Sequence, residues 1–369
     1  MRVQSVHTYD LRYPVWRGFA NSTTWNRART AGVVEVSTDD GLTGWGEGVR
    51  APSAGVLADR LIGRDPFDAV VIGRELAAAG ASMAQVSAVD IALFDLMGQA
   101  VERPCHQLLG GAVRERVPAY ASGLFLWSES DPVLGMEAEA AGYAEAGFPA
   151  VKMKIGHGPR NDAARAAAVR RAIGPDVLLA VDANCAYDRS TALESIRSIA
   201  EHDIYWYEEP VPPTEVEAYR EIRAGSGLRI AGGEALEGLN AFRDLVSKRA
   251  LDIVQPDISI AGGFTVCRQV ESLADAHGVQ VLPHMWGTSI RLAATLHWQA
   301  TIPDAPGLFP EPCLLEFDMT ENALRTELAT ESFQLVDGAV AVPTGPGLGI
   351  EIDREVLERY TVTAERVGS

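Results

Sequence analysis

The chain has 369 residues, of which 47% are hydrophobic and 22% carry charge, a composition typical of a soluble globular protein rather than a disordered one. The length exceeds what one compact core usually holds and predicts about two domains, one of them large. The formal net charge of -18 argues against nucleic acid and anionic membrane surfaces as general partners, so an anionic substrate would need a locally positive site.

The four cysteines, Cys105, Cys185, Cys267 and Cys313, lie far apart with no C-x-x-C spacing. This pattern indicates neither a disulfide framework nor a cysteine zinc site. The first residues, MRVQSVHTYDLRYPVW, lack an apolar core of signal-peptide length, and no apolar stretch is long enough to span a bilayer. We therefore expect a cytoplasmic protein.

Residues 1–115 mix strand and helix patterns and predict an α+β domain. The segments VQSVHTYDL and AGVVEVSTDDG alternate like antiparallel strands, with DDG as a turn. Residues 55–80 and 83–101 have helical apolar spacing. Between the first strands, residues 13–27 (YPVWRGFANSTTWNR) show no clear period. We predict a long loop there, of the kind that often forms a lid.

From about residue 117, short apolar strands alternate with helical stretches, a pattern that implies parallel strands. Eight such units over about 200 residues predict an α/β fold, a (β/α)8 barrel, within residues 116–335. Residues 336–369 are predicted to form a closing segment that packs back on the N-terminal domain. The expected strands lie in residues 117–122, 149–156, 176–184, 203–210, 228–234, 250–257, 278–284 and 313–318.

The chain contains only three lysines, Lys152, Lys154 and Lys248, among its 32 lysine and arginine residues. Two of them lie two residues apart in PAVKMKIG, on one face of an expected buried strand. Arginine keeps its proton inside proteins, whereas a lysine can lose it when it is desolvated or lies beside other positive charge. The pair therefore suggests a proton-transfer site, and the alternative is a basic strand end that faces water.

Almost every expected barrel strand ends in an ionisable residue, at intervals of about one strand–helix unit. Such positions lie side by side around the C-terminal rim of a barrel, where barrel active sites are found. An unpaired carboxylate is costly to bury, so an ordered series of this kind indicates a built site. The series is Lys154, Asp182, Glu208, Glu234, Asp257, His284 and Glu316.

Asp182, Glu208 and Glu234, on three adjacent strands, can converge as an all-oxygen metal site. Three carboxylates that leave positions for water and substrate suit Mg2+ better than zinc. Glu209 is a rival ligand, but neighbouring residues on a strand point to opposite faces. We therefore prefer Glu208 and expect Glu209 to pair with a cation behind the ligands. The alternative for the three acids is a ring of salt bridges that only stabilises the barrel.

Titratable groups flank this expected cation. Lys154, on the second barrel strand, and His284, on the seventh, come from opposite sides of the ring and would face the two sides of a bound substrate. Asp257, one unit before His284, can orient the imidazole and stabilise its charge. We assign Lys154 to proton transfer. We assign Lys152 to stabilising the charge that develops when a proton beside a carboxylate is removed.

Together these motifs resemble the enolase superfamily, mandelate racemase subgroup, over nearly the whole chain. The resemblance implies a modified TIM barrel with an N-terminal α+β capping domain. It implies one Mg2+ per subunit on the three acids, Lys154 as the base on one face and the His284–Asp257 dyad on the other. The motifs are K-x-K at Lys152 and Lys154, D-x-N at Asp182 and Asn184, E-E-P at Glu208, G-G-E at Glu234, Q-P-D at Asp257 and P-H at His284.

The resemblance also implies substrate contacts. Glu316 would hydrogen-bond a substrate carboxylate oxygen, and Asn184 would lie near that carboxylate. The capping-domain loops around Trp16–Trp25 and Val49–Gly55 would set substrate choice, with Trp25 as a contact residue. The partner would be a small carboxylate substrate, and a homo-oligomer is usual for the family.

Within the subgroup, YASGLF, LPHMWGTS and EPCLLEFDMTENALR are most similar to cycloisomerases that act on aldarolactones or anhydro-galactonate, and next to acid-sugar dehydratases. Both remove an α-proton to give an enediolate and then expel a β-oxygen. The predicted function is therefore Mg2+-dependent α-proton abstraction from a sugar acid or its lactone, followed by β-elimination. A racemase or epimerase is the alternative. A non-catalytic metal-binding barrel and a phosphate-binding barrel are weaker alternatives.

Overall fold

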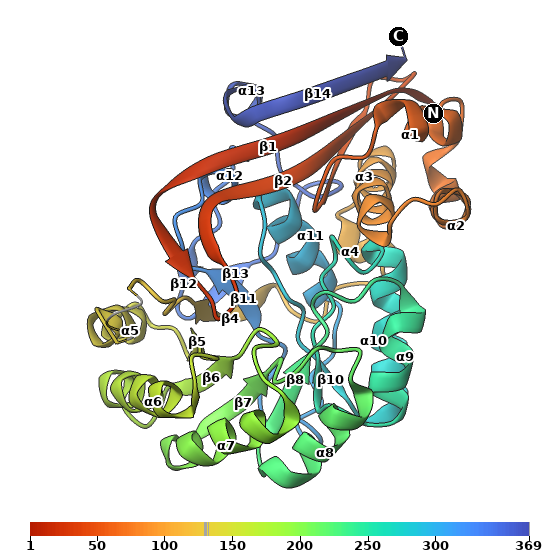
Figure 1. The fold of residues 1–369 in the computed structure, drawn as a ribbon. Helices are drawn as coiled ribbons and strands as arrows, with labels where there is room; N and C mark the ends of the chain where they lie inside the picture. The colour runs from red at the N-terminus through yellow and green to blue at the C-terminus, as the bar shows by residue number, and fades with distance from the viewer. Residues whose placement is uncertain (129–130, 132, 369) are drawn as a thin grey trace.

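The computed structural model describes residues 1–128, 131 and 133–368. A curved antiparallel sheet lies at one end of the molecule, beside a barrel of parallel strands surrounded by helices (Figure 1). The sheet has the strand order β14-β1-β2-β3, so the two ends of the chain lie in one sheet and Ser5 pairs with Gly368. Its strands are β1 (Val3–Ala20), β2 (Trp25–Thr38), β3 (Thr43–Gly48) and β14 (Thr361–Gly368).

Strand β3 packs directly on helix α3 because glycine alternates with larger residues in TGWGEG. A Cβ atom on Gly46 would lie 1.8 Å from the carbonyl oxygen of Ala88, so only glycine allows this approach. The opposite face of the strand carries Glu47, which is fully buried and accepts a hydrogen bond from Thr288 of the barrel. The helices of this region are α1 (Ala54–Leu61), the 3-10 helix η1 (Pro66–Asp68), α2 (Ala69–Ala78), α3 (Met83–Ala100) and α4 (Cys105–Leu108).

Residues 13–27, predicted as a loop, instead form the outer end of the β1–β2 hairpin. Tyr13 pairs with Arg29 and Ala20 pairs with Trp25, so the antiparallel ladder runs to the turn. The register shifts between Pro14 and Phe19, where five steps along β1 (14 to 19) oppose two along β2 (28 to 26). This irregularity breaks the two-residue alternation, which is why the sequence pattern did not indicate a strand.

The barrel confirms the predicted (β/α)8 class, and every expected strand segment contains a strand. Parallel pairing runs from β10 through β9, β8, β7, β6 and β5 to β4, which also pairs with β11. Consecutive parallel strands bring their C-terminal ends to one rim. The strands are β4 (Arg116–Ser122), β5 (Ala150–Lys154), β6 (Leu178–Asp182), β7 (Ile204–Glu208), β8 (Arg229–Gly232), β9 (Ile253–Val254), β10 (Gln280–Val281) and β11 (Leu315–Asp318).

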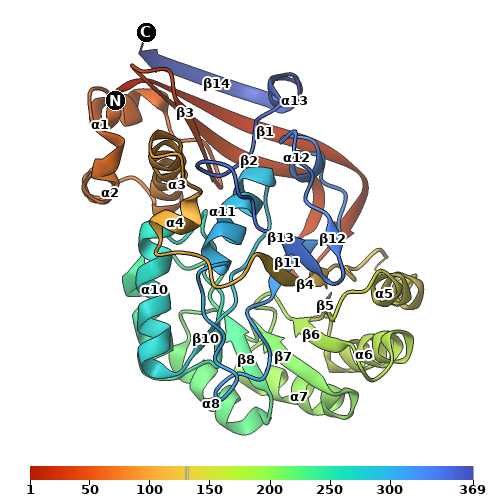
Figure 2. The same ribbon diagram turned by 180° about the vertical axis from the view of Figure 1, so that it is seen from behind.

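Helices cover the outside of the barrel (Figure 2). Its interior is packed and includes the fully buried aromatic side chains of Tyr120 and Trp206, whereas Tyr207 points outward and donates to Ser195 of α7. Among the described residues, no helix combines the length and apolar character needed to cross a bilayer. The helices are α5 (Met136–Glu145), α6 (Pro159–Ile173), α7 (Arg189–Ile199), η2 (Ala200–His202), α8 (Val216–Ser226), α9 (Leu239–Ser247), α10 (Gly263–His277), α11 (Ser289–Gln299) and α12 (Ala323–Thr326).

The C-terminal residues run from the barrel back to the antiparallel sheet. β12 (Leu335–Val336) and β13 (Ala339–Ala341) form a hairpin whose second strand pairs with the start of β4. The predicted division at 335/336 therefore falls inside this hairpin. Beyond it, α13 (Arg354–Tyr360) precedes β14, and Arg354 forms a two-pronged ion pair with Glu35 of β2 at 2.8 and 2.9 Å.

A buried histidine pair joins the two parts of the chain. His106 Nδ1 of α4 lies 3.1 Å from His297 Nδ1 of α11, and His297 Nε2 lies 3.0 Å from the carbonyl oxygen of Leu348. Because the carbonyl can only accept, His297 carries its proton on Nε2 and its Nδ1 accepts from His106. Burial lowers the pKa of His297 to about 4 from 6.5. The neutral ring is therefore part of the folded structure.

Acidification is expected to destabilise the protein through His297. An unfolded chain binds a proton at this ring below pH 6.5, whereas the folded chain does so only near pH 4. Stability from this group is therefore complete above pH 6.5 and falls by up to about 3 kcal/mol as the pH drops toward 4. Urea denaturation at several pH values measures it. His297→Gln, which keeps a donor for Leu348, should show a shallower decline, whereas His202→Gln on η2 should match the wild type.

Candidate active site

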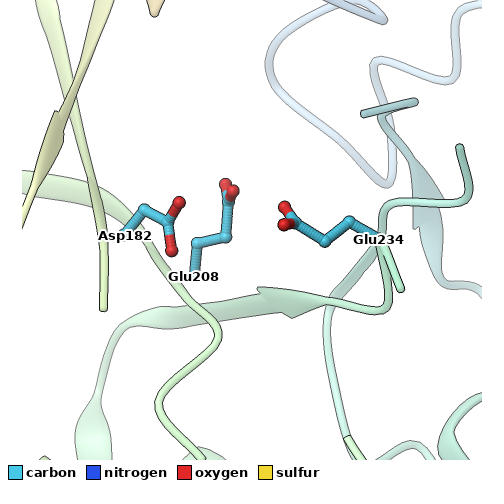
Figure 3. A group of neighbouring side chains, drawn as sticks. All are labelled: Asp182, Glu208 and Glu234. Atoms are coloured by element: carbon cyan, nitrogen blue, oxygen red, sulfur yellow. The ribbon is translucent and has the colours of Figure 1, made fainter. Parts of the chain in front are cut away.

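Three carboxylates meet at the C-terminal rim of the barrel. Asp182 ends β6, Glu208 ends β7, and Glu234 lies two residues beyond β8. One oxygen atom from each lies within 4.8 Å of the others, and the side chains converge on one space (Figure 3). Asp182 and Glu208 are fully buried, whereas the Glu234 side chain is 20% exposed. The structure thus brings together the three acids proposed as metal ligands from the sequence.

The donor set and its electrostatics fit a hard divalent cation. Burial raises the pKa of Glu208 to about 7, although Lys152 acts to lower it. Burial acts in the same direction on Asp182, but Lys154 and Lys152 outweigh it, and the pKa of Asp182 is lowered. Oxygen donors without nitrogen or sulfur suit Mg2+. The two lysines balance the negative charge of these carboxylates only in part. A divalent ion bound between the carboxylates would balance more of it.

Glu209, the rival ligand, lies where the chain leaves β7. Its φ of +42° places it in the left-handed region, and its carbonyl oxygen accepts a hydrogen bond from the Cys185 amide at 2.8 Å. The side chain is buried beside the Cys185 thiol, and Oε1 has no hydrogen-bond partner within the described residues. The predicted pairing of Glu209 with a cation is not found among the described residues, and its carboxyl instead lies beside the Cys185 thiol. Burial, with nearby carboxylates, raises the pKa of Glu209 well above its usual value.

The two lysines of β5 both point into the carboxylates. Lys152 Nζ lies 2.5 Å from Glu208 and 2.9 Å from Glu316, and Lys154 Nζ donates to Asp182. Burial acts to lower the pKa of each amine, but the carboxylates outweigh it, and the pKa of each is raised. The mutual repulsion anticipated from the sequence does act on Lys154, but it is weaker than the attraction of Asp182.

His284 lies at the other end of the cluster. Its Nε2 is 3.5 Å from Glu234, and its Nδ1 is 2.6 Å from Asp257 Oδ2. Asp257 is fully buried and also accepts from Arg291 Nη1 at 3.0 Å. Arg291 Nε in turn lies 3.0 Å from Glu47 of β3. A chain of alternating charges therefore connects the antiparallel sheet to the imidazole.

Glu316 and Asn184 both lie close to the acidic cluster, Glu316 at 3.9 Å from His284 Nε2 and Asn184 with its amide donating to Asp182 Oδ1 at 2.8 Å. Glu316 accepts hydrogen bonds from Ser122 Oγ at 2.7 Å and from the Met285 amide at 3.1 Å. Burial acts to raise the pKa of Glu316, but Lys152 and other cations hold it well below the usual range, so the group is an ionised acceptor. Asn184 has a φ of +44°, and its buried Oδ1 lacks a partner in the described part of the chain.

The tip of the β1–β2 hairpin lies on the rim of the barrel. Ser22 Oγ donates to the carbonyl oxygen of Ala183, directly after β6, at 2.7 Å. Phe19 packs against Phe125, which follows β4, with ring centroids 4.7 Å apart. Trp25, the predicted substrate contact, begins β2 next to this tip and is 38% exposed. The sequence indicated the segments that contain Phe19, Ser22 and Phe125, but it did not predict these contacts, because nothing in the local pattern shows which side chains meet across the two domains.

A hollow lies at the opposite end of the barrel. It measures about 1120 Å³ and includes Arg116, the first residue of β4, with Arg114 and His106 nearby. Barrel active sites form at the C-terminal ends of the strands. We therefore place the chemistry at the carboxylate rim rather than in this hollow.

The rim combines three carboxylates that could hold a cation with an amine and an imidazole. Lys154 contacts Asp182 at one end of the cluster, and His284 lies beside Glu234 at the other. Positioned amines and imidazoles act as general acids and bases, and fixed positive charge stabilises negative charge that develops in a reaction. The arrangement can therefore move a proton to or from a carbon atom held between the two groups.

Two family models match the chain. Residues 8–110 match the mandelate racemase / muconate lactonizing enzyme N-terminal domain, and residues 135–356 match the enolase C-terminal domain-like family. The two matches leave only the ends and a short connecting segment uncovered.

Proteins of known name match over almost the full length. The chain is 38% identical to the D-galactarolactone cycloisomerase of Agrobacterium fabrum, over 98% of this chain and 99% of that protein. It is 31% identical to the arabinonate dehydratase of Saccharolobus solfataricus, over 88% and 89%. A racemase from Streptomyces coelicolor A3(2), solved with bound magnesium, superposes with a TM-score of 0.86 at 30% identity over 98% and 100%.

Proposed function

This chain belongs to the mandelate racemase and muconate lactonizing enzyme family of the enolase superfamily, and we propose that it removes the α-proton of a sugar acid or sugar-acid lactone and then eliminates a β-oxygen. Ring opening of a lactone and dehydration of an aldonate can both begin with this proton removal. The named relatives, a cycloisomerase and a dehydratase, support this class of substrate.

We assign Asp182, Glu208 and Glu234 to one Mg2+ per subunit. When bound, the ion supplies positive charge to the substrate's carboxylate oxygens. Lys152, buried against Glu208 and Glu316, adds a fixed ammonium on the same side. Removing an α-proton spreads a second negative charge over the carboxylate, and positive groups already in place lower its cost.

The observation that carries the proposal is the position of the two bases. Lys154 contacts Asp182 and His284 approaches Glu234, at opposite ends of one cluster. A carboxylate substrate held at this cluster presents one face of its α-carbon to each group. We assign the proton removal to the base on the face that carries the proton. Asp257 keeps the His284 ring oriented through Nδ1.

Elimination needs a proton donor for the departing oxygen, and the same two groups can supply it. The leaving oxygen is a ring oxygen in a cycloisomerase and a hydroxyl in a dehydratase. A racemase is the second candidate, because bases on both faces also permit return of the proton to the opposite side. The named racemase structure supports this alternative.

Solvent exchange tests the proposal. The protein is incubated with Mg2+ in D2O and with a panel of aldonates, aldarates and their lactones. For at least one compound we expect a 2-keto-3-deoxy product that carries deuterium at C3, and deuterium at the α-carbon of any substrate that returns from the enediolate. Exchange with inversion but without elimination would favour the racemase instead. Mg2+ binding with neither exchange nor elimination on any member of the panel would contradict the proposal and favour a non-catalytic barrel.

We also propose that the protein is a homo-oligomer, as is usual for the family. Light scattering at micromolar concentration gives the mass in solution. A single mass of 39.5 kDa would contradict this proposal.

A further inference from the structure

A separate pocket opens beside His284, between the antiparallel sheet and the barrel. It measures about 240 Å³ and is lined by Arg29 of β2, Val49 after β3, and His284, Trp286 and Asn322 of the barrel. His284 belongs both to this pocket and to the candidate active site. A substrate held at the carboxylates can therefore extend past the imidazole into it.

Arg29, which lines this pocket, has a guanidinium nitrogen that donates no hydrogen bond to any residue that the structure describes. Its Nη2 donates to Asp318 at 2.8 Å, and its guanidinium lies over the Trp286 ring, 3.7 Å from the centroid. The side chain is 5% exposed, and Nη1 has no hydrogen-bond partner within the described residues. Buried polar groups are nearly always satisfied, so an unused guanidinium nitrogen fixed by two contacts points to a missing acceptor.

Asn322 offers the complementary group. Its Nδ2 donates to the carbonyl oxygen of Gly287 at 2.9 Å, which fixes the orientation of the amide. The side chain is 4% exposed, and Oδ1 lacks a partner in the described part of the chain. Arg29 Nη1 and Asn322 Oδ1 therefore give the pocket a fixed donor and a fixed acceptor that have no hydrogen-bond partner within the described residues.

Arg291, a second arginine that lines the pocket, has acidic partners within the protein. Arg291 donates to Asp257 and lies beside Glu47, so its charge is balanced within the protein. Arg29 is balanced only through its second nitrogen, by Asp318. The ligand expected here accepts a strong hydrogen bond from Nη1 and carries a hydroxyl for Asn322.

We propose that Arg29 and Asn322 form a subsite for the far end of the substrate, and that this end is oxidised to a carboxylate or lactone carbonyl. This inference rests on the proposed function, since the near carboxylate is taken to lie at the acidic cluster. Acyl oxygens are stronger acceptors for a guanidinium than the hydroxymethyl group that ends an aldonate. The preferred substrates are thus aldarates or aldarolactones.

A matched pair of compounds tests the subsite. Galactarate and galactonate differ only at C6, which is a carboxylate in the first and a hydroxymethyl group in the second. A third compound, galactaro-1,4-lactone, shows whether the subsite prefers a lactone carbonyl to a free carboxylate. For each compound, kcat and KM for α-proton exchange are measured with wild type, Arg29→Lys and the control Arg27→Lys, an exposed neighbour on the same strand.

Arg29→Lys keeps a cation for Asp318 and loses the forked donor. We expect it to raise KM for galactarate or its lactone by about 10- to 100-fold and to leave galactonate within about threefold. Arg27→Lys should change neither. Asn322→Ala, which leaves the Arg29–Asp318 pair intact, should raise KM for the same compound and serves if Arg29→Lys does not fold.

An equal rise in KM for galactarate and galactonate in both Arg29→Lys and Asn322→Ala would contradict the proposed subsite. A wild-type preference for galactonate would contradict it as well. Either result would still establish proton abstraction. Absence of exchange on every compound with wild type would instead count against the proposed function itself. If Arg29→Lys raises KM more for galactarate, the subsite binds a free carboxylate. If it raises KM more for the lactone, the subsite binds a lactone carbonyl.

Discussion

Replacing Lys154 by alanine is expected to lower the rate of α-proton exchange by about 10²- to 10⁴-fold on a substrate whose proton faces this side, the usual loss when a positioned acid–base group is removed. Lys154 Nζ contacts Asp182 directly, so the substitution also removes a positive charge from the metal position. Mg2+ binding should therefore persist. Deuterium incorporation measures the first effect, and calorimetric titration with Mg2+ measures the second.

Lys248→Ala is the matched control, because Lys248 is the remaining lysine of the chain and its side chain is 46% exposed. It should exchange like the wild type. His284→Asn tests the opposite face and should abolish exchange on a substrate of the other configuration. If both site variants exchange as fast as the wild type while they bind Mg2+, neither group is a base.

Replacing Glu234 by glutamine is expected to remove most of the Mg2+ affinity and with it the exchange activity. Glu234 supplies one of three carboxylates and is the most exposed of them, so the substitution leaves the buried core intact. An ion that binds only the folded protein raises the melting temperature with its concentration. The wild type should show this rise between micromolar and millimolar Mg2+, and Glu234→Gln should not.

Glu215→Gln provides the control for Glu234, because it removes one negative charge at an exposed position of the barrel. Its melting temperature should rise with the Mg2+ concentration by the same amount as that of the wild type. A rise of equal size in Glu234→Gln would show that the ion binds elsewhere, and the metal assignment would then fail.

The barrel could be predicted from the sequence because an ionisable residue recurs at the end of almost every strand–helix unit. Asp182 and Glu208 stand at strand ends one unit apart, and parallel pairing places them side by side at Lys154↔Asp182 and Asp182↔Glu208. The spacing of ionisable residues therefore encodes the rim. The helices of the barrel followed from their apolar period in the same way.

Contacts between the sheet and the barrel could not be predicted, because they join residues far apart in sequence with no shared period. Arg29 meets Asp318 across 289 positions, and Ser22 meets Ala183 across 161. The register shift in β1 also concealed the hairpin that carries Ser22. The local sequence around Arg29 alternates as an ordinary strand does, and only the fold shows what the guanidinium faces.

The ion pair between Glu47 and Arg291 limits which N-terminal domains can be combined with this barrel in a chimeric protein. Without the N-terminal part of the chain, Arg291 would lose the carboxylate of Glu47 and keep its ion pair with Asp257. A chimera that joins this barrel to another N-terminal half must therefore bring an acidic side chain to the position of Glu47. Recombination at the junction near residue 115 is then constrained by this carboxylate in addition to the other contacts between the sheet and the barrel, such as Arg29–Asp318.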